Sequence, residues 1–578
     1  MMMQPPLFKK TFLENQIVTK MINETVFTEQ EFSTDVYKLY HSTKQMTIKE
    51  MEENNPKSPT EDIRGVAQII LNRCMFIMFA EDETKQLLPR QTMYQTLSDP
   101  IKRDVLNNNH NELWSNSNKL FLDINIGNPK KNIQKYNGGL FRKKFDDYTI
   151  RDNVASDFYQ GCEVKTNLKL PDNIKGDIIG KNVNPIFRNL MHMSSFDFEK
   201  DVGVEMLGNI FEQSIQQEAE AAKKGRRTNI QKMEAIYYTP EYITEFICRN
   251  TIIPFLSKSG TSDLPKLIDE YSGDIEQLEK KLQDIKILDP ACGSGAFIVK
   301  AADTLLEIWD AIFSFKESIG KYQTTAVKKR KKITGLSKIT RFTDPEKMKR
   351  VILDNIYGVD INIESVEITK LSFFLKVAPT KAVLPILEDN IKNGNSLIDN
   401  ESFPKGFDWK TKFQKIIQNG GFDIIIGNPP YIKEYTNKPV FEDVKNSKSS
   451  VSEYYEGKMD YWYMFTCISL DLLKEGGYHS FIATNNWNTA SGATILRNKI
   501  IAETKILRYI DFVDFKVFNN ADQQTMIFIL RKDSSDNSFT TRCNRILEKS
   551  ILEDDVKSFL NGGKIPKGID NYKAKLER

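Results

Sequence analysis

From Tyr237 onward, short apolar runs alternate with longer helical patterns, and this alternation constrains the fold more than any other feature of the sequence. The runs cover residues 285–288, 356–359, 422–426, 478–483, 507–513 and 525–530. Strands separated by helical stretches pair in parallel through helical crossovers. The sequence therefore predicts an α/β fold with a doubly wound, mostly parallel sheet. The last two runs leave too little chain for a crossover, which predicts an antiparallel hairpin at the sheet edge.

The segments on either side of this region have different patterns. Near the N-terminus, apolar residues recur at three- and four-residue steps, as on one buried helix face: Ile63, Val66, Ile70, Cys74 and Ile77. We expect a mainly helical N-terminal domain over residues 1–235 and an α/β domain over residues 236–535. Residues 536–578 are polar and charged, and we expect a polar C-terminal tail with one short helix near residues 546–560.

The composition is that of an ordinary soluble protein, with 578 residues, 40% hydrophobic residues and a net charge of only +3. Any contact with nucleic acid must therefore use a local basic patch. The clearest patch is the Lys/Arg run at 328–332, although such runs are also common in solvated loops. No Cys/His cluster has metal-ligand spacing, so we expect no metal site. We see no signal peptide and no uninterrupted apolar stretch of roughly 18 residues, so we expect a cytoplasmic protein without membrane association.

A glycine-containing loop follows the first apolar run, and its sequence is Asp-Pro-Ala-Cys-Gly-Ser-Gly-Ala-Phe at 289–297. Its glycines allow a tight turn and a close backbone approach to a ligand at the strand end. The loop lacks the Gly-Lys-Ser/Thr ending of a phosphate loop, and Ile298 replaces the third glycine of a dinucleotide fingerprint. S-adenosylmethionine, which has a zwitterionic end and no pyrophosphate, fits better. The cofactor-binding candidates in this loop are Asp289, Pro290, Ala291, Gly293, Gly295 and Phe297.

Two later strand ends carry further candidates for the cofactor. Asp360, followed by Ile361, ends the second run, where a carboxylate can accept both ribose hydroxyls. Asp360 also suits the N-cap of the helix expected after it, so both roles stay open. Asn395 and Ser396 follow a glycine, and this segment on its own would be a turn. As the third in the series, Asn395 is a candidate for a hydrogen bond to the adenine of the cofactor.

The loop Asn428-Pro429-Pro430-Tyr431 follows the third run and is the predicted catalytic loop. Two consecutive prolines fix the backbone, so the carbonyl of Pro429 points in one direction. This carbonyl and the side-chain oxygen of Asn428 are two acceptors, which suit an NH2 group on a nucleobase. Holding both protons localises the nitrogen lone pair toward a methyl donor, which is catalysis by positioning and electrostatics. Tyr431 supplies an aromatic face for the base.

A base within a duplex must leave the helix to reach this loop. A second aromatic wall is then expected opposite Tyr431. Phe518, shortly before the last run, is our candidate, and Phe515 is the alternative. A purely structural role in the core competes with this assignment, because phenylalanine is usually buried.

These motifs together resemble the N6-adenine DNA methyltransferases in which the cofactor motif precedes Asn-Pro-Pro-Tyr. The resemblance implies an S-adenosylmethionine-dependent methyltransferase fold, with residues 236–535 as the catalytic domain. It also implies methyl transfer to the N6 amine of adenine in double-stranded DNA, within a restriction–modification system. Tyr238, Thr239 and Pro240 resemble the motif that precedes the glycine loop in this family, which implies that they cover the methionine end of the cofactor.

The resemblance extends from about residue 60 to residue 531, and it includes the connector of bifunctional type IIG restriction–modification enzymes. The turn at 137–141 and the segment 207–212 carry this part. Residues before 60 are too few for a nuclease domain of roughly 100 residues or more, and those after 530 are too few for a recognition domain. We therefore expect that a separate polypeptide supplies target recognition.

Two alternatives stay open at this point. One is a bifunctional endonuclease–methyltransferase, because Glu163-Val164-Lys165 has the form of a nuclease triplet, with Asp152 and Asp157 upstream. No strand pattern supports this triplet. The other alternative is a DNA-binding remnant without turnover.

Overall fold

The protein was analysed as a computed structural model, and its described residues form two compact units. These residues are 29–54, 56, 59–81, 88–97, 113–133, 135, 140–141, 185–194, 239–327, 349–377, 386–518, 523–536, 538–547 and 551–577. The first unit contains Met1–Ser214 and Glu367–Glu388, and the second contains Ile215–Val366 and Asp389–Arg578.

The described part of the first unit is helical, as predicted. Its helices are α3 (Glu29–Asn54), α4 (Thr60–Ala80), α6 (Leu113–Ile126), the 3-10 turn η1 (Pro129–Lys131) and α8 (Pro185–Met193). All five periodic apolar residues from Ile63 to Ile77 are buried in α4. Arg73 of α4 donates from Nε to the carbonyl of Leu140 at 2.9 Å, and its guanidinium lies over the rings of Phe121 and Phe141. This buried arginine therefore ties α4 to the turn at 140–141.

Helix α4 is apolar over most of its length. Within the described part of the chain, its window Ile63–Ala80 is the one helix long and apolar enough to cross a membrane by composition, and 94% of that window is buried inside the structure. Burial of this extent is what a central core helix shows.

The second unit is built on a nine-stranded sheet with the order β3-β2-β1-β4-β5-β7-β6-β8-β9. The strands are β1 (Ile287–Asp289), β2 (Ile356–Asp360), β3 (Ile391–Asn393), β4 (Phe422–Gly427), β5 (Leu473–Thr484), β6 (Thr504–Asp511), β7 (Thr525–Lys532), β8 (Ser538–Ile546) and β9 (Ile569–Glu577). Strands β1 to β5 pair in parallel, and β7 is antiparallel to both β5 and β6. The predicted fold class, the six predicted strands and the antiparallel β6–β7 pair are confirmed. Their predicted edge position is wrong, because β7 lies between β5 and β6 and β8 pairs with β6.

Residues 536–578 do not form the polar tail that their composition suggests. β8 pairs in parallel with β6, and β9 pairs antiparallel with β8. Along β8 the residues Phe539, Thr541 and Cys543 are buried at alternate positions. Charged and polar neighbours hide this two-residue period in the sequence. β9 is mostly exposed, which explains why its composition resembles a tail. The expected short helix is present as α21 (Glu553–Leu560).

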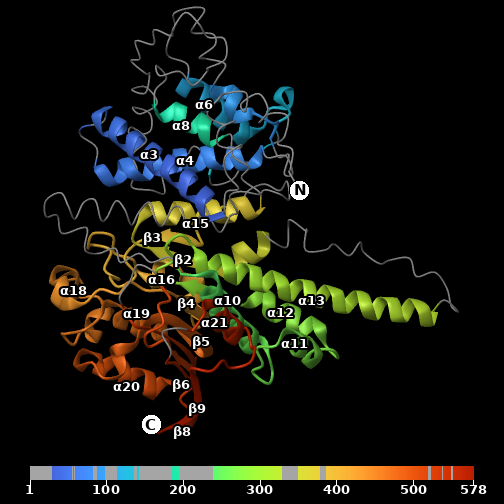
Figure 1. Ribbon diagram of the computed structural model, residues 1–578, viewed down its shortest axis with the longest axis vertical. Coiled ribbons are helices and arrows are strands. Elements are labelled where there is room, and N and C mark those ends of the chain that lie inside the picture. Colours follow the sequence, from blue (N-terminus) through green and yellow to red (C-terminus); the bar gives the residue numbers. More distant parts are fainter. Residues whose placement is uncertain are drawn as a thin grey trace, which may run out of the picture. The chain divides into compact units, whose positions relative to one another are not determined.

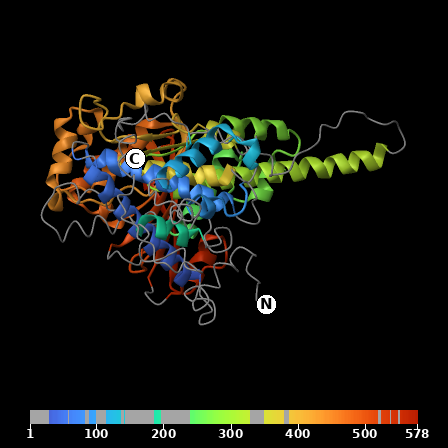
Figure 2. The same cartoon turned by 90° about the horizontal axis from the view of Figure 1, so that it is seen from above.

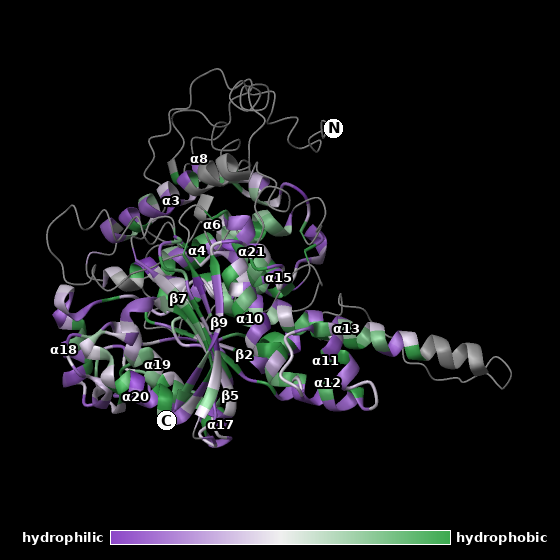
Figure 3. Cartoon of the chain, turned by 60° about the horizontal axis from the view of Figure 1, so that its bottom comes forward, coloured by the Kyte–Doolittle hydropathy of each residue, from purple (hydrophilic) through white to green (hydrophobic). Residues whose placement is uncertain are grey.

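Helices cover both faces of the sheet. The longer helices of the second unit are α10 (Glu241–Leu256), α11 (Leu264–Glu270), α12 (Ile275–Asp284), α13 (Ala296–Val327), α18 (Lys438–Asn446), α19 (Tyr461–Leu472) and α20 (Thr494–Glu503). The boundary between the two units divides α15 (Ile363–Val377). Short helical segments are η3 (Val351–Asn355), α16 (Trp409–Lys412), α17 (Gln414–Gln418), η5 (Glu434–Thr436), η6 (Ser450–Tyr454), η7 (Asn485–Asn488) and η8 (Ser491–Ala493). α10 and α13 contact strands β1, β2, β4 and β5, whereas α19 and α20 contact β5 and β6. Figure 3 shows the strands between these two helical layers.

Helix α13 is much longer than its neighbours. Its first half is buried against the sheet, and both Figure 1 and Figure 2 show its second half extending beyond α11 and α12. The predicted basic run at 328–332 follows directly after α13 and lies outside the described residues.

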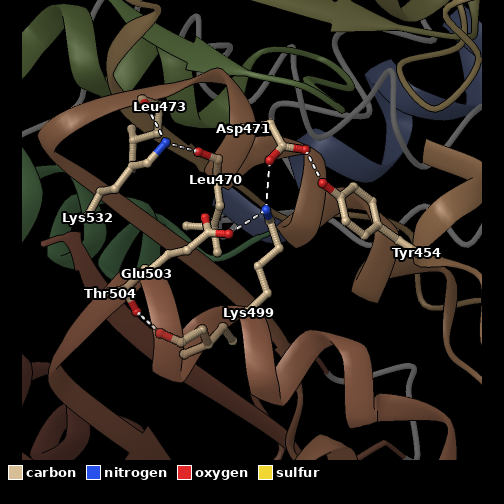
Figure 4. Close-up of polar contacts among 9 residues, drawn as sticks. Tyr454, Leu470, Asp471, Leu473, Lys499, Glu503, Thr504 and Lys532 are labelled. Atoms are coloured by element: carbon tan, nitrogen blue, oxygen red, sulfur yellow. Dashed lines mark hydrogen bonds and ion pairs between the residues drawn. The ribbon is translucent and has the colours of Figure 1, made fainter. Parts of the chain in front are cut away.

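Ion pairs with a buried lysine hold α20 against α19. Nζ of Lys499 lies 2.7 Å from a carboxylate oxygen of Asp471 and 2.7 Å from one of Glu503 (Figure 4). Asp471 also accepts a hydrogen bond from the hydroxyl of Tyr454. The pKa of Lys499 is raised by these two carboxylates, which outweigh the opposing effect of burial. Lys499 therefore stays protonated at neutral pH.

A second lysine satisfies the end of α19. Lys532 of β7 donates to the carbonyl of Leu470 at 2.6 Å and to that of Leu473 at 2.9 Å (Figure 4). The last carbonyls of a helix lack intrahelical partners. The lysine therefore provides a partner where α19 continues directly into β5.

Candidate active site

Three loops meet because β1 lies between β2 and β4 and pairs in parallel with both. The loops that leave the carboxyl ends of these strands are the glycine loop after β1, the turn after β2 and the catalytic loop after β4. Ligands of open α/β sheets bind at this edge. The order of the strands therefore brings together motifs that are more than 130 residues apart in sequence.

The glycine loop has the conformation that its sequence predicts. Gly293 and Gly295 have φ angles of 52° and 91°, in a region that residues with a Cβ rarely adopt. The amide of Cys292 donates to the carbonyl of Val359 at 3.0 Å, and the amide of Gly295 donates to that of Cys292 at 2.8 Å. The first bond attaches the loop to the end of β2, and the second closes the turn within the loop. Phe297, another candidate, is buried in the first turn of α13.

Asp360 connects the end of β2 to the glycine loop. Its Oδ2 accepts from the amide of Gly293 at 2.9 Å, and its Oδ1 accepts from the amide of Asn362 at 2.8 Å. Burial raises the pKa of this carboxyl, while the two amides act in the opposite direction. The capping bond at the start of α15 comes instead from Asn362, whose Oδ1 accepts from the amide of Glu364 at 2.8 Å. The competing N-cap role thus belongs to Asn362, and the ribose contacts of Asp360 and Ile361 stay a prediction.

Asn395 and Ser396 lie beside the glycine loop. The hydroxyl of Ser396 donates to the carbonyl of Pro290 at 2.6 Å. Asn395 is buried, its Oδ1 accepts from the amide of Leu397 at 3.0 Å, and its side chain hydrogen-bonds to Tyr461. The structure thus shows Asn395 shaping a turn, and its contact with an adenine stays a prediction.

The catalytic loop contacts both the motif that contains Thr239 and the glycine loop. Nδ2 of Asn428 donates to the hydroxyl of Thr239 at 3.0 Å. A Cβ added at Gly427 would lie 2.6 Å from Oδ1 of Asp289, so the backbone before Asn428 packs directly on the buried carboxylate of the glycine loop. Oδ1 of Asp289 also accepts from the amide of Ala291 at 3.0 Å. Asp289, Thr239 and Asn428 therefore form one connected cluster.

Two aromatic rings lie next to each other at the same edge. The hydroxyl of Tyr431 donates to the carbonyl of Ile482 at 2.9 Å. The rings of Tyr431 and Phe518 have centroids 6.4 Å apart at an interplanar angle of 64°. Phe515 instead packs on Phe512, with centroids 6.2 Å apart. Of the two predicted candidates, Phe518 is the one in contact with Tyr431.

Several predicted features lie outside the described residues. They are Tyr238, the triplet at 163–165 with Asp152 and Asp157, the basic run at 328–332, the segment 207–212, and residues 137–139 of the connector turn. Pro240 is described and is the N-cap residue of α10. Within the described ranges, no group of three or more His, Cys, Asp or Glu side chains is arranged to hold a metal ion.

A buried carboxylate that the sequence does not indicate lies beside the catalytic loop. Asp460 forms a β-bridge with Lys433, two residues after Tyr431, and its Oδ2 accepts from the hydroxyl of Thr484 at 3.3 Å. Burial raises the pKa of Asp460 to about 7, and the charge of Lys433 opposes that shift. From the sequence alone, an aspartate directly before the helix that starts at Tyr461 indicates only a helix N-cap.

A cavity of about 370 Å³ adjoins this carboxylate through Lys433 and Thr484. Its polar lining comes from Lys433, in the segment after β4, and from the ends of β5, β6 and β7 with their loops: Thr484, Asn485, Asn486, Asp514, Lys516, Gln523 and Gln524. Val513 and Phe515 complete the lining. Its size is within the usual range for a site that holds a small molecule or a single nucleobase.

Comparisons with known proteins agree with this arrangement. Residues 354–518 match the family model of the Eco57I restriction-modification methylase. The chain is 26% identical over 496 residues to the type II restriction enzyme and methyltransferase RM.Eco57I of Escherichia coli, a match that covers 83% of this chain and 42% of the relative. It is 28% identical over 387 residues to a putative type II restriction enzyme and methyltransferase, RM.MjaORFECS2P, of Methanocaldococcus jannaschii, covering 59% of this chain and 28% of the relative. The chain thus spans less than half the length of both relatives.

The fold is also shared with a solved restriction–modification enzyme. The type IIL restriction-modification enzyme MmeI, solved in complex with DNA, superposes with a TM-score of 0.55 and 15% identity, covering 88% of this chain and 58% of MmeI. Because the identity is low, this likeness concerns the fold. Residues 354–518 are similar to the Eco57I restriction-modification methylase family, and the fold of the chain is similar to that of MmeI.

Proposed function

We propose that this protein transfers a methyl group from S-adenosylmethionine to the N6 amine of adenine in double-stranded DNA, as part of a restriction–modification system. The observation that carries the proposal is the contact of the catalytic loop with the two cofactor motifs. Asn428 bonds to Thr239 at 3.0 Å, and Gly427 lies against Asp289. This cluster supports a site in which a base amine and a methyl donor meet. The names of the two relatives include methyltransferase activity.

The residues at the edge fit S-adenosylmethionine better than a phosphate-rich cofactor. The glycine loop presents backbone with positive φ angles at Gly293 and Gly295 and has no lysine between Asp289 and Phe297. The buried carboxylate of Asp289 and the partly buried carboxylate of Asp360 suit hydroxyl and ammonium groups rather than phosphates. When bound, S-adenosylmethionine supplies an activated methyl group on a sulfonium.

In this mechanism the protein positions the amine. The hydrogen bond from Nδ2 of Asn428 to Thr239 uses a donor of the amide and fixes its plane, so Oδ1 serves as an acceptor. Oδ1 of Asn428 and the carbonyl of Pro429 each accept a hydrogen bond from one N–H of the amine. The rigid Pro429-Pro430 backbone limits reorganisation during the reaction. Tyr431 and Phe518 hold the extrahelical base through their rings, and the hydrogen bond to Ile482 anchors Tyr431.

The first test removes the amide acceptor. Asn428→Ala should lower methyl transfer at least about a hundredfold, in line with the loss of one preorganised polar group, while S-adenosylmethionine binding changes little. Asn419→Ala, an exposed asparagine just before β4, is the matched control. The assay measures transfer to unmethylated genomic DNA and identifies the product nucleoside by mass spectrometry. Transfer by Asn428→Ala at the control rate, or a product other than N6-methyladenine, would contradict the proposal.

The names of the relatives also favour a second function, a bifunctional restriction enzyme and methyltransferase. Magnesium-dependent cleavage of unmethylated DNA by the purified chain would establish it. Our proposal places the protein in the cytoplasm without membrane association, with DNA and a separate target-recognition polypeptide as partners. Co-purification of a second polypeptide that makes methylation sequence-specific would support the proposed recognition partner.

A further inference from the structure

A second cavity, of about 760 Å³, lies away from the catalytic edge and shares no lining residue with the cavity near Lys433. We call it the arginine cavity. Its walls come from α10, α21, the start of α11 and strands β6, β8 and β9. Three arginines line it, and two of them lie on the sheet, Arg508 on β6 and Arg542 on β8. They are directly opposite each other in the parallel β6–β8 register. Two like charges in neighbouring strand positions repel each other.

Arg508 is held in place by aromatic rings. Its guanidinium lies 4.8 Å from the ring centroid of Phe246 on α10 and 5.6 Å from that of Phe559 on α21. Its Nε is buried and has no hydrogen-bond partner among the described residues. Burial, together with the charge of Arg542, lowers the pKa of Arg508 to about 10. The rings thus fix the plane of the guanidinium without neutralising it.

The other charged groups of the cavity do not neutralise the arginine pair. Arg249 forms an ion pair with Glu307 at 2.5 Å. The carboxylate of Asp263 accepts from the amide of Lys266 at 2.9 Å, as the cap of α11. Glu245 also lines the cavity. Within the described part of the chain, neither Arg508 nor Arg542 has a carboxylate within ion-pair distance. Arg508 and Arg542 therefore line this space without a carboxylate at ion-pair distance, and Glu245 and Asp263 are the carboxylates of the lining.

We propose that the arginine cavity is a binding site for a phosphate group, contacted by Arg508 and Arg542. Planar guanidinium donors match phosphate geometry and bind it through paired hydrogen bonds. A phosphate would provide an acceptor for the buried Nε of Arg508 and would relieve the repulsion between the two arginines. Asn544, buried beside Arg542 on β8, has an amide oxygen without a partner among the described residues. This acceptor suits a hydroxyl of the same ligand, such as that of a ribose. The volume suits a mononucleotide.

The test measures binding of inorganic phosphate, adenosine 5′-monophosphate and a short DNA duplex to the full chain by calorimetry and thermal shift. Sodium chloride at matched ionic strength is the reference. We expect at least one phosphate-bearing probe to bind, and both Arg508→Gln and Arg542→Gln to weaken it about tenfold or more. Arg531→Gln, an exposed arginine on β7, is the matched control and should bind as the wild type does.

The three probes distinguish a small phosphate ligand from the phosphate backbone of DNA. A response to phosphate or to the mononucleotide identifies a small ligand, whereas an arginine-dependent response to the duplex alone identifies the DNA backbone. Binding should persist in Asn428→Ala, because the cavity is independent of the catalytic loop. Arg542 is exposed, so its variant stays informative even if Arg508→Gln does not fold. No response of the wild type to any probe, or unchanged affinity in Arg542→Gln, would overturn the proposal.

Discussion

Gly427 shows how a single residue links the cofactor motif to the catalytic motif. A Cβ there would lie 2.6 Å from Oδ1 of Asp289, and that oxygen is already bonded to the amide of Ala291. We predict that Gly427→Ala lowers S-adenosylmethionine affinity and methyl transfer each by about tenfold or more, because the carboxylate and the loop must shift. Gly273→Ala, where an added Cβ meets nothing within 4 Å, is the control. In a double-mutant cycle, adding Gly427→Ala to the Asp289→Ala variant should lower affinity and methyl transfer little further, because the clashing carboxylate is gone. Fully additive effects of the two substitutions would contradict a direct clash.

His479 should make the folded protein less stable as the pH falls. The ring is buried in β5, with Nδ1 3.1 Å from the carbonyl of Ile425, and burial lowers its pKa to about 3 from the ordinary 6.5. As the pH falls below 6.5, the unfolded chain takes up a proton that the folded ring excludes. The free energy of unfolding should therefore drop by up to about 1.4 kcal/mol per pH unit from this residue. Urea unfolding at about pH 5 and about pH 7.5 should show a smaller drop in His479→Gln, and equal drops would exclude His479 as the cause.

The pH dependence of stability expected from Asp460 is opposite in direction to that expected from His479. Its carboxyl has a pKa of about 7 in the folded protein and 3.8 ordinarily, so the unfolded chain releases its proton first as the pH rises. Stability from this residue is present at low pH and is lost between those two values, with Lys433 limiting the loss. Asp460→Asn should raise the free energy of unfolding relative to wild type at about pH 8 and change it little near pH 4. A difference that does not vary with pH would show that Asp460 does not titrate in this range.

At the scale of elements, α20 depends on the ion pairs of Lys499. The lysine side chain is only 11% exposed, against 42% for Asp471 and 34% for Glu503. Lys499→Met should lower the free energy of unfolding by roughly 1–2 kcal/mol, because it leaves two carboxylates close together without their cation. Lys557→Met removes a more exposed pair on α21, at 41% exposure, and should cost at most about 0.5 kcal/mol. Equal losses in urea unfolding would show that the Lys499 cluster (Figure 4) is an ordinary surface pair.

The sequence predicts elements well where the chain is buried on both faces. β4 is buried at every position, and its apolar run is continuous, as expected for a central parallel strand. β3 has only three residues, Ile391–Asn393, two of them polar, and such a run cannot be distinguished from a loop. β9 is exposed along most of its length and carries no apolar period. These strands exist because of pairing with neighbours, which local sequence does not encode.

At the scale of the whole molecule, the strand order explains which parts of the site the sequence could predict. Asp289 and Asn428 follow buried strands, so their place at the sheet edge follows from topology. The bond between Asn428 and Thr239 joins residues 189 positions apart, and no local pattern indicates it. Asp460 and the arginine pair of β6 and β8 are also products of long-range pairing. Sequence motifs therefore predict which chemical groups the site contains, whereas the contacts between motifs become known only from the fold.

The continuous sheet also predicts how the molecule unfolds. β8 pairs with β6 from Arg542 to Arg545, and α21 contacts α10 and buries Val556, Phe559 and Leu560. Removal of residues 538–578 would expose this apolar surface and the edge of β6, which favours aggregation. We predict that this deletion lowers the main unfolding temperature of the second unit by at least about 5 °C, because the strands belong to one cooperative core. Calorimetry of the full chain and of the deletion variant tests this. The deletion would instead remove a separate, weaker transition and leave the main one unchanged if β8, α21 and β9 formed an independent module.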